Sequence, residues 1–357
     1  MKTDSAAADV QVAVVIPAFG VEVHIAEVLR GLPQWVAWII VVDDVSPDNT
    51  AAVVANESRR DPRIRLLRHE VNRGVGGAVL TGYREALRLG ADVVVKMDGD
   101  GQMDPRHLPA LIDPLVRGQA DYAKGNRYLH ARQLRSMPLA RRVGNLALSF
   151  LTKLASGYWS LFDPTNGYTA IHAAVIPLLN EEGIARRYFF ESSMLLELSL
   201  LRAVACDVGI PAQYGRETSH LSVARTLCEF PGALLKGFLR RLWIQYFVRD
   251  FSIASLYLVV GLLLLGTGAT FGAIHWYCSA QHGAAAPTGT VMLAVLPIVL
   301  GFQFLLQAVG LDIQDQPRQC LHHTFVAEAL AQERDFPSSG CSTDEIPEAP
   351  MPQRRAA

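Results

Sequence analysis

Four short apolar runs near the start of the chain each give way to polar side chains, and helix-like segments separate them. The runs lie at residues 12–17, 38–42, 64–67 and 93–95, and helices are expected at 22–30, 51–59 and 78–89. β-branched runs of this length are typical of buried strands. Alternating strands and helices predict a mostly parallel sheet with ligand-binding side chains at the carboxyl ends of its strands. The chain is therefore expected to begin with an α/β domain.

The fourth apolar run is followed by two carboxylates and an amide. Asp98 and Asp100 are separated only by Gly99, and Gln102 follows two residues later. Hard oxygen ligands at the mouth of a sheet suit Mg²⁺ or Mn²⁺, and such an ion suits a diphosphate. Because aspartate and glycine are also ordinary loop residues, this interpretation depends on the polar residues at the other strand ends.

Three other classes of site do not fit. The glycines at 74, 76 and 77 follow the third strand rather than the first and do not match G-x-G-x-x-G, so a Rossmann dinucleotide site is not expected. The chain has no Walker G-x-x-x-x-G-K-[S/T] motif. A net charge of −1 argues against a nucleic-acid partner. We instead expect the glycines to let the backbone approach a ligand.

Several motifs follow one another in order between residues 11 and 220. They are IPAF at 16–19, VDDVSPDNT at 42–50, NRG at 72–74, DGD at 98–100, GNRY at 125–128, RRVGN at 141–145 and DPTNGY at 163–168. The first four resemble a family 2 glycosyltransferase of GT-A fold, a Rossmann-like and mostly parallel α/β architecture. The last three are similar to polyprenol-phosphate sugar transferases, the group containing dolichol-phosphate mannose synthase and bacterial undecaprenyl-phosphate glycosyltransferases. This resemblance implies transfer of one sugar from a nucleotide donor to a lipid monophosphate.

The resemblance also implies roles for the donor-side residues. Metal held by Asp98, Asp100 and Gln102 would neutralise the leaving diphosphate. Asp44 stands where an acceptor for a ribose hydroxyl is wanted. The residues expected to line the nucleotide sugar are Pro17, Ala18, Phe19, Glu22, Asp44, Asp98 and Gly99.

On the acceptor side, Arg127 and Arg141 match the family's phosphate-binding arginines, and Arg142 is an equal candidate by spacing. Asp163 is expected to face the sugar. Glu191 is either a sugar or acceptor contact or a helix-capping acid. Because the acceptor phosphate is already anionic, no general base is required. The expected catalytic set is Asp98, Asp100, Arg127, Arg141, Asp163 and Glu191.

The chain departs from the family's pattern in two places. Gly20 and Val21 stand where polar residues are usual. The later basic motif reads YGRETSH at 214–220, which leaves either Arg216 or His220 for a third phosphate contact.

Two segments, 251–274 and 290–311, carry no charged residue and are long enough to span a bilayer. Residues 222–250 place apolar side chains at helical spacing among arginines, which predicts an interfacial amphipathic helix, broken near Pro231 and Gly232. A buried helix pair and an ordinary surface helix are the alternatives. Because the loop 275–289 has no Lys or Arg, the positive-inside rule places both chain ends in the cytoplasm.

The expected organisation has five parts. They are a flexible N-terminus (1–10), a GT-A domain (11–221), interfacial helices (222–250), a transmembrane pair (251–311) and a mostly disordered tail (312–357) with a short helix near 325–332. In that tail, His322 and His323 are interpreted as incidental. The five cysteines form no C-x-x-C pair and are expected to be thiols of a reducing cytosolic domain, with Cys278 the exception.

The sequence thus predicts an enzyme of the inner, cytoplasmic membrane that depends on Mg²⁺ or Mn²⁺. It would transfer one sugar from a UDP- or GDP-sugar to polyprenyl phosphate, such as undecaprenyl phosphate. A processive polysaccharide synthase is one alternative, but the usual Gln-x-x-Arg-Trp motif and further spans are missing. A non-enzymatic nucleotide-binding scaffold is the other. The sugar, the nucleotide and the oligomeric state, a homo-oligomer included, are left open.

Overall fold

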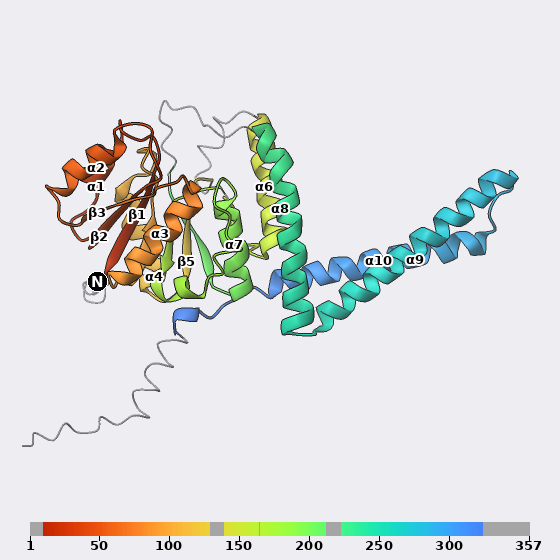
Figure 1. Ribbon diagram of the computed structural model, residues 1–357. Coiled ribbons are helices and arrows are strands. Elements are labelled where there is room, and N and C mark those ends of the chain that lie inside the picture. The colour runs from red at the N-terminus through yellow and green to blue at the C-terminus, as the bar shows by residue number, and fades with distance from the viewer. Residues whose placement is uncertain (1–9, 129–138, 164, 212–222, 324–357) are drawn as a thin grey trace, which may run out of the picture.

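The first strand, β1 (Val12–Ala18), lies near the middle of a sheet and faces two apolar cores. Ala13 and Val15 are buried in one core, and Val12, Val14 and Ile16 are buried in the other. Alternate residues of a strand point to opposite faces, so an unbroken apolar run marks a strand covered on both sides. The computed structural model describes residues 10–128, 139–163, 165–211 and 223–323, without the side chains of 139–142 and 223–229 (Figure 1).

The sheet has seven strands in the order β3-β2-β1-β4-β6-β5-β7. Strand β6 is antiparallel to its neighbours β4 and β5, and the other pairs are parallel. The prediction of a mostly parallel α/β sheet is confirmed. The remaining strands are β2 Trp38–Asp43, β3 Ile64–Arg68, β4 Val93–Lys96, β5 Tyr122–Asn126, β6 Thr169–His172 and β7 Ala205–Gly209.

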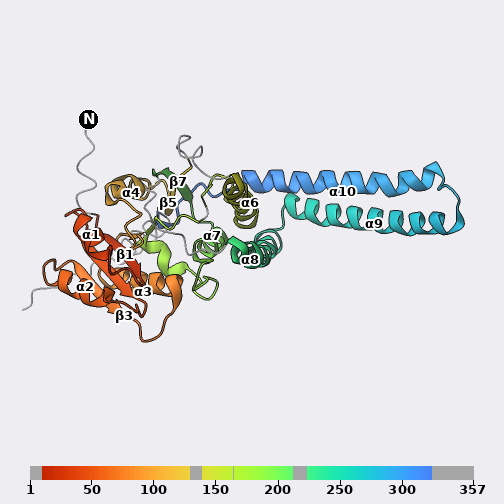
Figure 2. The same ribbon diagram turned by 90° about the horizontal axis from the view of Figure 1, so that it is seen from above.

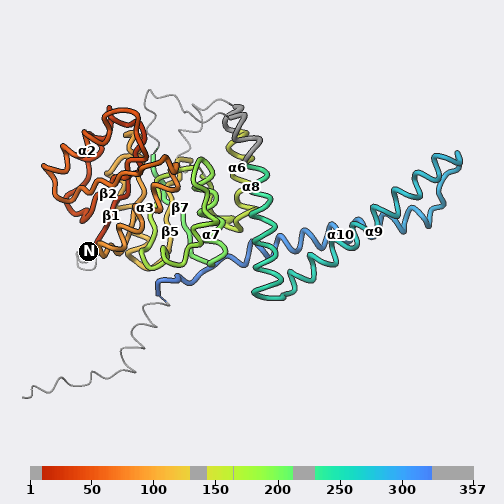
Figure 3. Tube along the Cα trace, in the orientation of Figure 1, coloured from red at the N-terminus to blue at the C-terminus, as the bar shows by residue number. Residues whose placement is uncertain are grey.

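Helices cover both faces of the sheet. Those of the α/β domain are α1 Ile25–Gly31, α2 Thr50–Ser58, α3 Gly74–Arg88, α4 Leu108–Val116, α6 Leu139–Ser156 and α7 Phe190–Leu201, with short helices η1 Pro105–His107 and η2 Ala173–Leu178. Then come α8 Val223–Trp243, the π-helix η3 Ile244–Arg249, α9 Ile253–His282 and α10 Thr288–Gln314. Helices α6 and α8 lie side by side at the edge of the domain (Figures 1 and 3).

The glycines after β3 do not form the ligand-facing loop that the sequence suggested. They form the first turn of α3, where a Cβ at Gly74 would lie 2.3 Å from the carbonyl oxygen of Arg186, and one at Gly76 would lie 2.2 Å from that of Ala185. The Gly76 N–H donates to the Arg186 carbonyl at 2.9 Å. The glycines therefore admit a neighbouring stretch of the protein's own backbone.

Helix α8 continues through Pro231, so the predicted break near that residue is wrong. Phe230 and Leu234 are buried beside the proline, and Phe230 meets the ring of Phe189 edge-on. Packing on both sides of the proline outweighs the loss of one helical hydrogen bond.

Helices α9 and α10 form a hairpin that projects away from the domain (Figure 2). They are 30 and 27 residues long, and both are apolar enough by composition to cross a membrane. They pack closely where glycines meet, since a Cβ at Gly301 would lie 2.7 Å from the backbone of Leu265 and one at Gly261 would lie 3.1 Å from the Gly301 carbonyl. Both predicted apolar segments are helices. Helix α9 begins at Ile253, after the predicted start at 251, and continues past 274 to His282, and α10 exceeds the predicted 290–311 at both ends.

A buried carboxylate joins the hairpin to the rest of the molecule. Asp312, near the end of α10, accepts two hydrogen bonds from the guanidinium of Arg241 on α8, at 2.7 and 3.0 Å. It also accepts from the Tyr246 hydroxyl at 2.6 Å and from the indole N–H of Trp159 at 3.1 Å. Arg241 is only 2% exposed and also donates to the Ala155 carbonyl of α6. One ion pair thus ties α6, α8, η3 and α10 together.

The predicted tail boundary at residue 312 differs from the structure. Helix α10 extends to Gln314, and residues 315–323 return to the α/β domain, where Arg202 pairs with Asp315 at 2.8 Å. The reason is that polar side chains near the end of α10 find buried partners on the domain. The predicted short helix at 325–332 lies outside the described residues.

We predict that Asp312→Ala lowers the thermal midpoint of the detergent-purified protein by roughly 5–15 °C, since removing one partner of a buried ion pair costs about 3–5 kcal/mol. The matched control is Asp315→Ala, which breaks the exposed Arg202 pair and should cost about 0–1 kcal/mol. Equal midpoints for the two variants, measured by differential scanning fluorimetry, would contradict the role given to Asp312.

Candidate functional site

Polar side chains gather at the carboxyl ends of β1, β2 and β4, which are neighbours in the sheet. The loop after β1 and the loop after β2 are fastened to each other. The Gly20 N–H donates to the Ser46 hydroxyl at 3.1 Å, and the Val21 N–H donates to the Thr50 hydroxyl at 3.0 Å. This network holds the strand ends as one rigid surface.

Glu22 belongs to the same network. Its carboxylate accepts from the backbone and side-chain N–H groups of Asn49, at 3.0 and 3.1 Å. Its own N–H donates to Asp48 at 3.1 Å. Nearby, Phe19 is 55% exposed, Pro17 is half-buried and Ala18 is buried. These residues lie together as predicted, and their contact with a nucleotide stays a prediction.

Asp44 is buried and organises the loop after β3. Its carboxylate accepts from the backbone N–H groups of Arg73 and Gly74, at 2.8 and 2.7 Å, and lies 2.7 Å from His69 Nδ1. The predicted ribose contact therefore belongs to a side chain that already positions three partners. Carboxylate oxygens carry about four lone-pair sites, so room for another donor is left.

A buried ammonium links Asp98 to Glu191. The Lys96 Nζ lies 2.9 Å from an oxygen of Asp98 and 3.1 Å from an oxygen of Glu191. Burial alone would lower the pKa of Lys96, but the two carboxylates outweigh it and raise the pKa, so the group stays charged. A Cβ at Gly167 would lie 2.2 Å from the Lys96 Nζ, so a larger residue there would push the ammonium away from its two carboxylates. The sequence reasoning found Glu191 but missed Lys96.

The carboxylate and amide oxygens at the strand ends are hard ligands, which suit a hard divalent ion such as Mg²⁺ or Mn²⁺. Asp98 is one third exposed at its side chain, Asp100 is half-buried and Gln102 is exposed. The Gln102 N–H donates to the Asp100 carboxylate at 3.0 Å. A Cβ at Gly99 would lie 3.2 Å from Ile25 of α1 and 3.3 Å from Val21 of the loop after β1, so the backbone between the two carboxylates packs against these residues. Mg²⁺ is commonly held by one or two carboxylates together with substrate phosphates, and this donor set matches that description.

Arg127 forms a two-pronged ion pair with Asp163. Its Nε and one terminal nitrogen donate to the two carboxylate oxygens at 2.7 and 2.9 Å. Burial pushes the pKa of Asp163 upward, but the bonds from Arg127 and the charge of Lys124 outweigh it and hold the pKa below its usual range. Both residues were predicted as site residues, and the structure brings them together. The guanidinium is one third exposed, and its phosphate role stays a prediction.

Two further ionisable groups, Lys124 and Asp207, lie near this pair and were not identified from the sequence. Lys124 on β5 is buried, and its amine has no hydrogen-bond partner among the described residues. Burial lowers the pKa of Lys124 and raises the pKa of Asp207 on the adjacent strand. A lysine in the middle of the short strand YAKGN was the only available signal.

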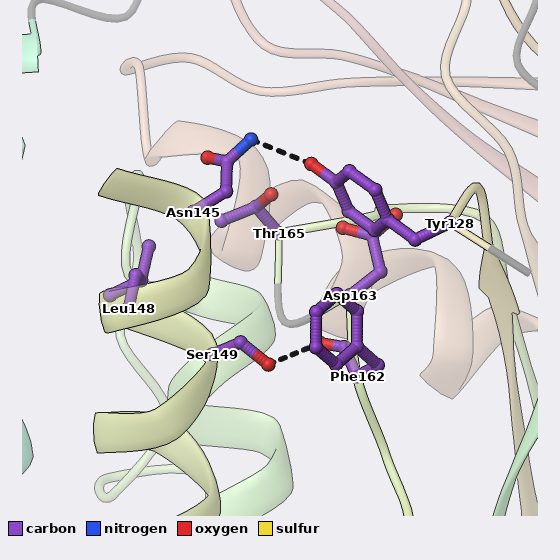
Figure 4. Close-up of a pocket in the computed structure, with 7 residues that line it drawn as sticks. All are labelled: Tyr128, Asn145, Leu148, Ser149, Phe162, Asp163 and Thr165. Atoms are coloured by element: carbon purple, nitrogen blue, oxygen red, sulfur yellow. Dashed lines mark hydrogen bonds between the residues drawn. The ribbon is translucent and has the colours of Figure 1, made fainter. Parts of the chain in front are cut away.

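A pocket opens between α6 and the loop that carries Asp163 (Figure 4). In it the Asn145 amide donates to the Tyr128 hydroxyl at 2.6 Å, and the Ser149 hydroxyl donates to the Phe162 carbonyl at 3.0 Å. The lining residues are Tyr128, Asn145, Leu148, Ser149, Phe162, Asp163 and Thr165. The pocket brings together residues of three motifs recognised in the sequence, GNRY, RRVGN and DPTNGY.

Four of the predicted basic residues have side chains that the structure does not describe. Arg141 and Arg142 fall in the first turns of α6, but their side chains lie outside the described part. Arg216 and His220 lie within 212–222, which is likewise outside it.

Helix α6 carries an apolar face that the sequence reasoning did not identify. Val143, Leu146 and Phe150 are 58%, 56% and 54% exposed, at the spacing of one helix face. On α8, Leu239 and Trp243 are 56% and 62% exposed. Clustered exposed apolar side chains of this kind are typical of surfaces that contact a membrane or another protein.

Comparison with known proteins gives a consistent set of relatives. The model of the family described as Glycosyl transferase family 2 matches residues 13–178. A UDP-N-acetylglucosamine–dolichyl-phosphate N-acetylglucosaminyltransferase of Methanococcus voltae is 34% identical over 194 residues, which cover 51% of this chain and 77% of that protein. An undecaprenyl-phosphate mannosyltransferase of Micrococcus luteus is 31% identical over 173 residues, which cover 48% and 70%.

Among solved structures, the chain is similar to glucosyl-3-phosphoglycerate synthase from Mycobacterium tuberculosis. The complex of that enzyme with Mn²⁺, UDP and glucosyl-3-phosphoglycerate has a TM-score of 0.50 and 20% identity, and the match covers 66% of this chain and 81% of that one. At this identity the likeness shows the fold alone, which is the GT-A architecture that the motifs predicted.

We predict that Lys96→Met lowers kcat/KM for sugar transfer by roughly ten- to a hundredfold, because charge-assisted hydrogen bonds worth about 1.5–3 kcal/mol no longer position Asp98 and Glu191. Lys96→Arg should not restore the rate, since Lys96 is fully buried beside Gly167 and the larger guanidinium would have to displace its neighbours. The control Arg117→Met removes an exposed ion pair with Asp113 and should leave the rate unchanged. Wild-type kinetics in Lys96→Met would contradict this role.

Proposed function

Because the chain belongs to glycosyl transferase family 2, we propose that it transfers a single sugar from a nucleotide sugar to a polyprenyl phosphate at a membrane surface. One observation carries the proposal. The same chain carries the strand-end site with Asp98 and Asp100, the exposed apolar faces of α6 and α8, and the long apolar hairpin. The relatives named above act on dolichyl and undecaprenyl phosphates, which are the acceptors such a surface would suit.

The donor would lie across the ends of β1, β2 and β4. Phe19 offers an exposed ring to the base, and Asp44 holds the neighbouring turn in place. A divalent ion bound by Asp98, Asp100 and Gln102 would supply neutralisation of the leaving diphosphate. Mn²⁺ accompanies UDP in the structural neighbour, but for this chain Mg²⁺ and Mn²⁺, and UDP and GDP, are equal proposals.

In the reaction, an oxygen of the acceptor phosphate attacks the anomeric carbon of the sugar. The bond from that carbon to the donor diphosphate breaks, and the nucleoside diphosphate leaves with the bonding electrons. The acceptor oxygen is already anionic, so the chain need not remove a proton. Positioning is the main requirement, and Arg127, Arg141 and Glu191 are our candidates for it.

Two features favour a lipid acceptor over a soluble one. The pocket beside Asp163 is bounded by α6, and α6 presents Val143, Leu146 and Phe150 outward along the same helix. An isoprenoid chain in the membrane would thus lie beside the helix that lines the pocket. We propose that α6 and α8 lie in the interface and that α9 and α10 span the bilayer.

The metal claim is tested by Asp100→Asn, assayed with labelled nucleotide sugar and undecaprenyl phosphate. Losing a residue that binds the metal directly should cost more than the roughly ten- to hundredfold typical of losing a residue that only hydrogen-bonds to a metal ligand. We therefore expect transfer to fall by at least about a hundredfold with the fold intact. Asp113→Asn, an exposed acid on α4, is the matched control. Full transfer by Asp100→Asn, or by the wild type in EDTA, would refute the assignment.

The same assay separates the rival functions. A processive synthase would give polymer rather than one sugar per lipid, and a non-catalytic scaffold would bind nucleotide and give no product.

For topology, we predict that the hairpin tip lies on the side of the membrane opposite the catalytic domain, since the loop of 275–289 lacks Lys and Arg. Ala285→Cys, in a Cys278→Ser background, should react with an impermeant thiol reagent in intact cells. Ala285 is exposed, and it avoids the left-handed backbone of Gly283. Protection at this position, with labelling only after lysis, would reverse the orientation.

A further inference from the structure

The chain folds back onto the catalytic domain after α10, at the amino end of the sheet and away from the strand-end site. The anchor is Asp121, which precedes β5 and is fully buried. One of its oxygens accepts from the N–H groups of Val204 and Leu321, at 2.8 and 3.0 Å. The other accepts from the N–H of His322 at 3.2 Å and lies 2.7 Å from Nδ1 of the same residue. Asp121 therefore fixes both the backbone and the ring of His322.

Fixing the ring also fixes its tautomer. With Nδ1–H donated to Asp121, the lone pair of His322 is on Nε2. A carboxylate that holds the far ring nitrogen in this way is the usual companion of a histidine that ligates a metal. His172 stacks on the His322 ring with centroids 4.2 Å apart and planes 12° apart, which restrains the ring further.

Two other ligand-type side chains share this spot. The Cys320 sulfur donates to the Gly118 carbonyl at 3.3 Å, and the His323 Nε2 lies 2.9 Å from the same oxygen. One ligand atom from each of Cys320, His322 and His323 lies within 4.8 Å of the other two. Across the described part of the chain, this is the group of three or more His, Cys, Asp or Glu side chains that comes close enough to hold an ion.

Gly118 makes the arrangement sterically possible. Its φ of +66° favours glycine, and a Cβ there would lie 2.3 Å from the His323 Nε2. The His323 ring thus occupies the space beside the end of α4 that a side chain at position 118 would otherwise fill.

We propose that Cys320, His322 and His323 bind a zinc ion that fastens the segment after α10 to the catalytic domain. Thiolate and imidazole are borderline-soft ligands that suit zinc, unlike the carboxylate and amide oxygens at the strand ends. Three protein ligands leave a fourth tetrahedral position for water. On binding, the Cys320 sulfur loses its proton to solvent. The His323 Nε2, which donates as an N–H to the Gly118 carbonyl, gives up that proton as the ring takes the Nδ1–H form through exchange with solvent, and its Nε2 lone pair then turns to the ion.

This interpretation replaces the one from sequence, in which His322 and His323 were incidental. Sequence spacing shows only C-x-H-H, whereas the fold adds Asp121 and Gly118 from about two hundred residues away. The zinc site does not depend on the proposed transfer reaction, since it shares no residue with the strand-end site.

The test is the metal content of the full-length, untagged protein, purified in detergent and dialysed against zinc and then against metal-free buffer. We expect about one zinc per chain, held by the three protein ligands and one water. Cys320→Ser combined with His323→Gln should lose it. Cys206→Ser, a half-buried cysteine on β7, is the matched control and should keep it.

Cobalt substitution gives a second readout that separates ligand loss from misfolding. The wild type should show thiolate-to-cobalt charge-transfer absorption, and His323→Gln alone, at an exposed position, should weaken cobalt binding at an unchanged thermal midpoint of the apo protein. No retained zinc in the wild type would overturn the proposal. Retention of zinc by the double variant would overturn it equally.

Discussion

The ion pair between Arg241 and Asp312 is the contact that joins the apolar hairpin to the α/β domain. Asp312 is the only charged residue of α10, and it is placed where the hairpin meets the domain. Its four hydrogen bonds come from α6–β6 loop, α8 and η3 groups that are themselves buried or half-buried. A buried charge of this kind is costly unless fully paired, so the joint permits one arrangement of the hairpin. The position of the strand-end site relative to the hairpin follows from this joint.

The strand-end site is rigid for related reasons. The loops after β1 and β2 hold each other through backbone-to-side-chain bonds, and Asp44 holds the loop after β3. Lys96 then ties β4 to the start of α7 through Asp98 and Glu191. In our proposal these contacts are made before substrate binds, so binding energy need not be used to order the site.

Much of the fold was readable from the sequence because the signals are local. The apolar runs 12–17, 38–42 and 93–95 matched strands within two residues, and the two uncharged segments are helices. The failures involve partners far away in the chain. Gly74 and Gly76 meet backbone near residue 186, and the helix through Pro231 is supported by packing against Phe189.

The residues of the candidate site likewise fall into those that could be found from local sequence and those that depend on distant partners. Asp98, Asp100 and Asp163 were found by motif, and the structure adds that Asp163 is paired with Arg127. Lys96 and Lys124 were missed, since a lysine inside a strand pattern looks like an edge or a solvent-facing position until its partners, up to 95 residues away, are known. The role of each remaining residue toward donor and acceptor stays a prediction.

The most direct test of the central claim is product analysis with the wild-type protein. The full-length chain, in vesicles containing undecaprenyl phosphate, is given labelled UDP- and GDP-sugars, and a parallel reaction contains a water-soluble phosphate monoester instead. Our account predicts label in the organic phase, with a mass of one sugar added to the lipid phosphate, and none on the soluble acceptor. Label on the soluble acceptor alone, or in polymer, would contradict it.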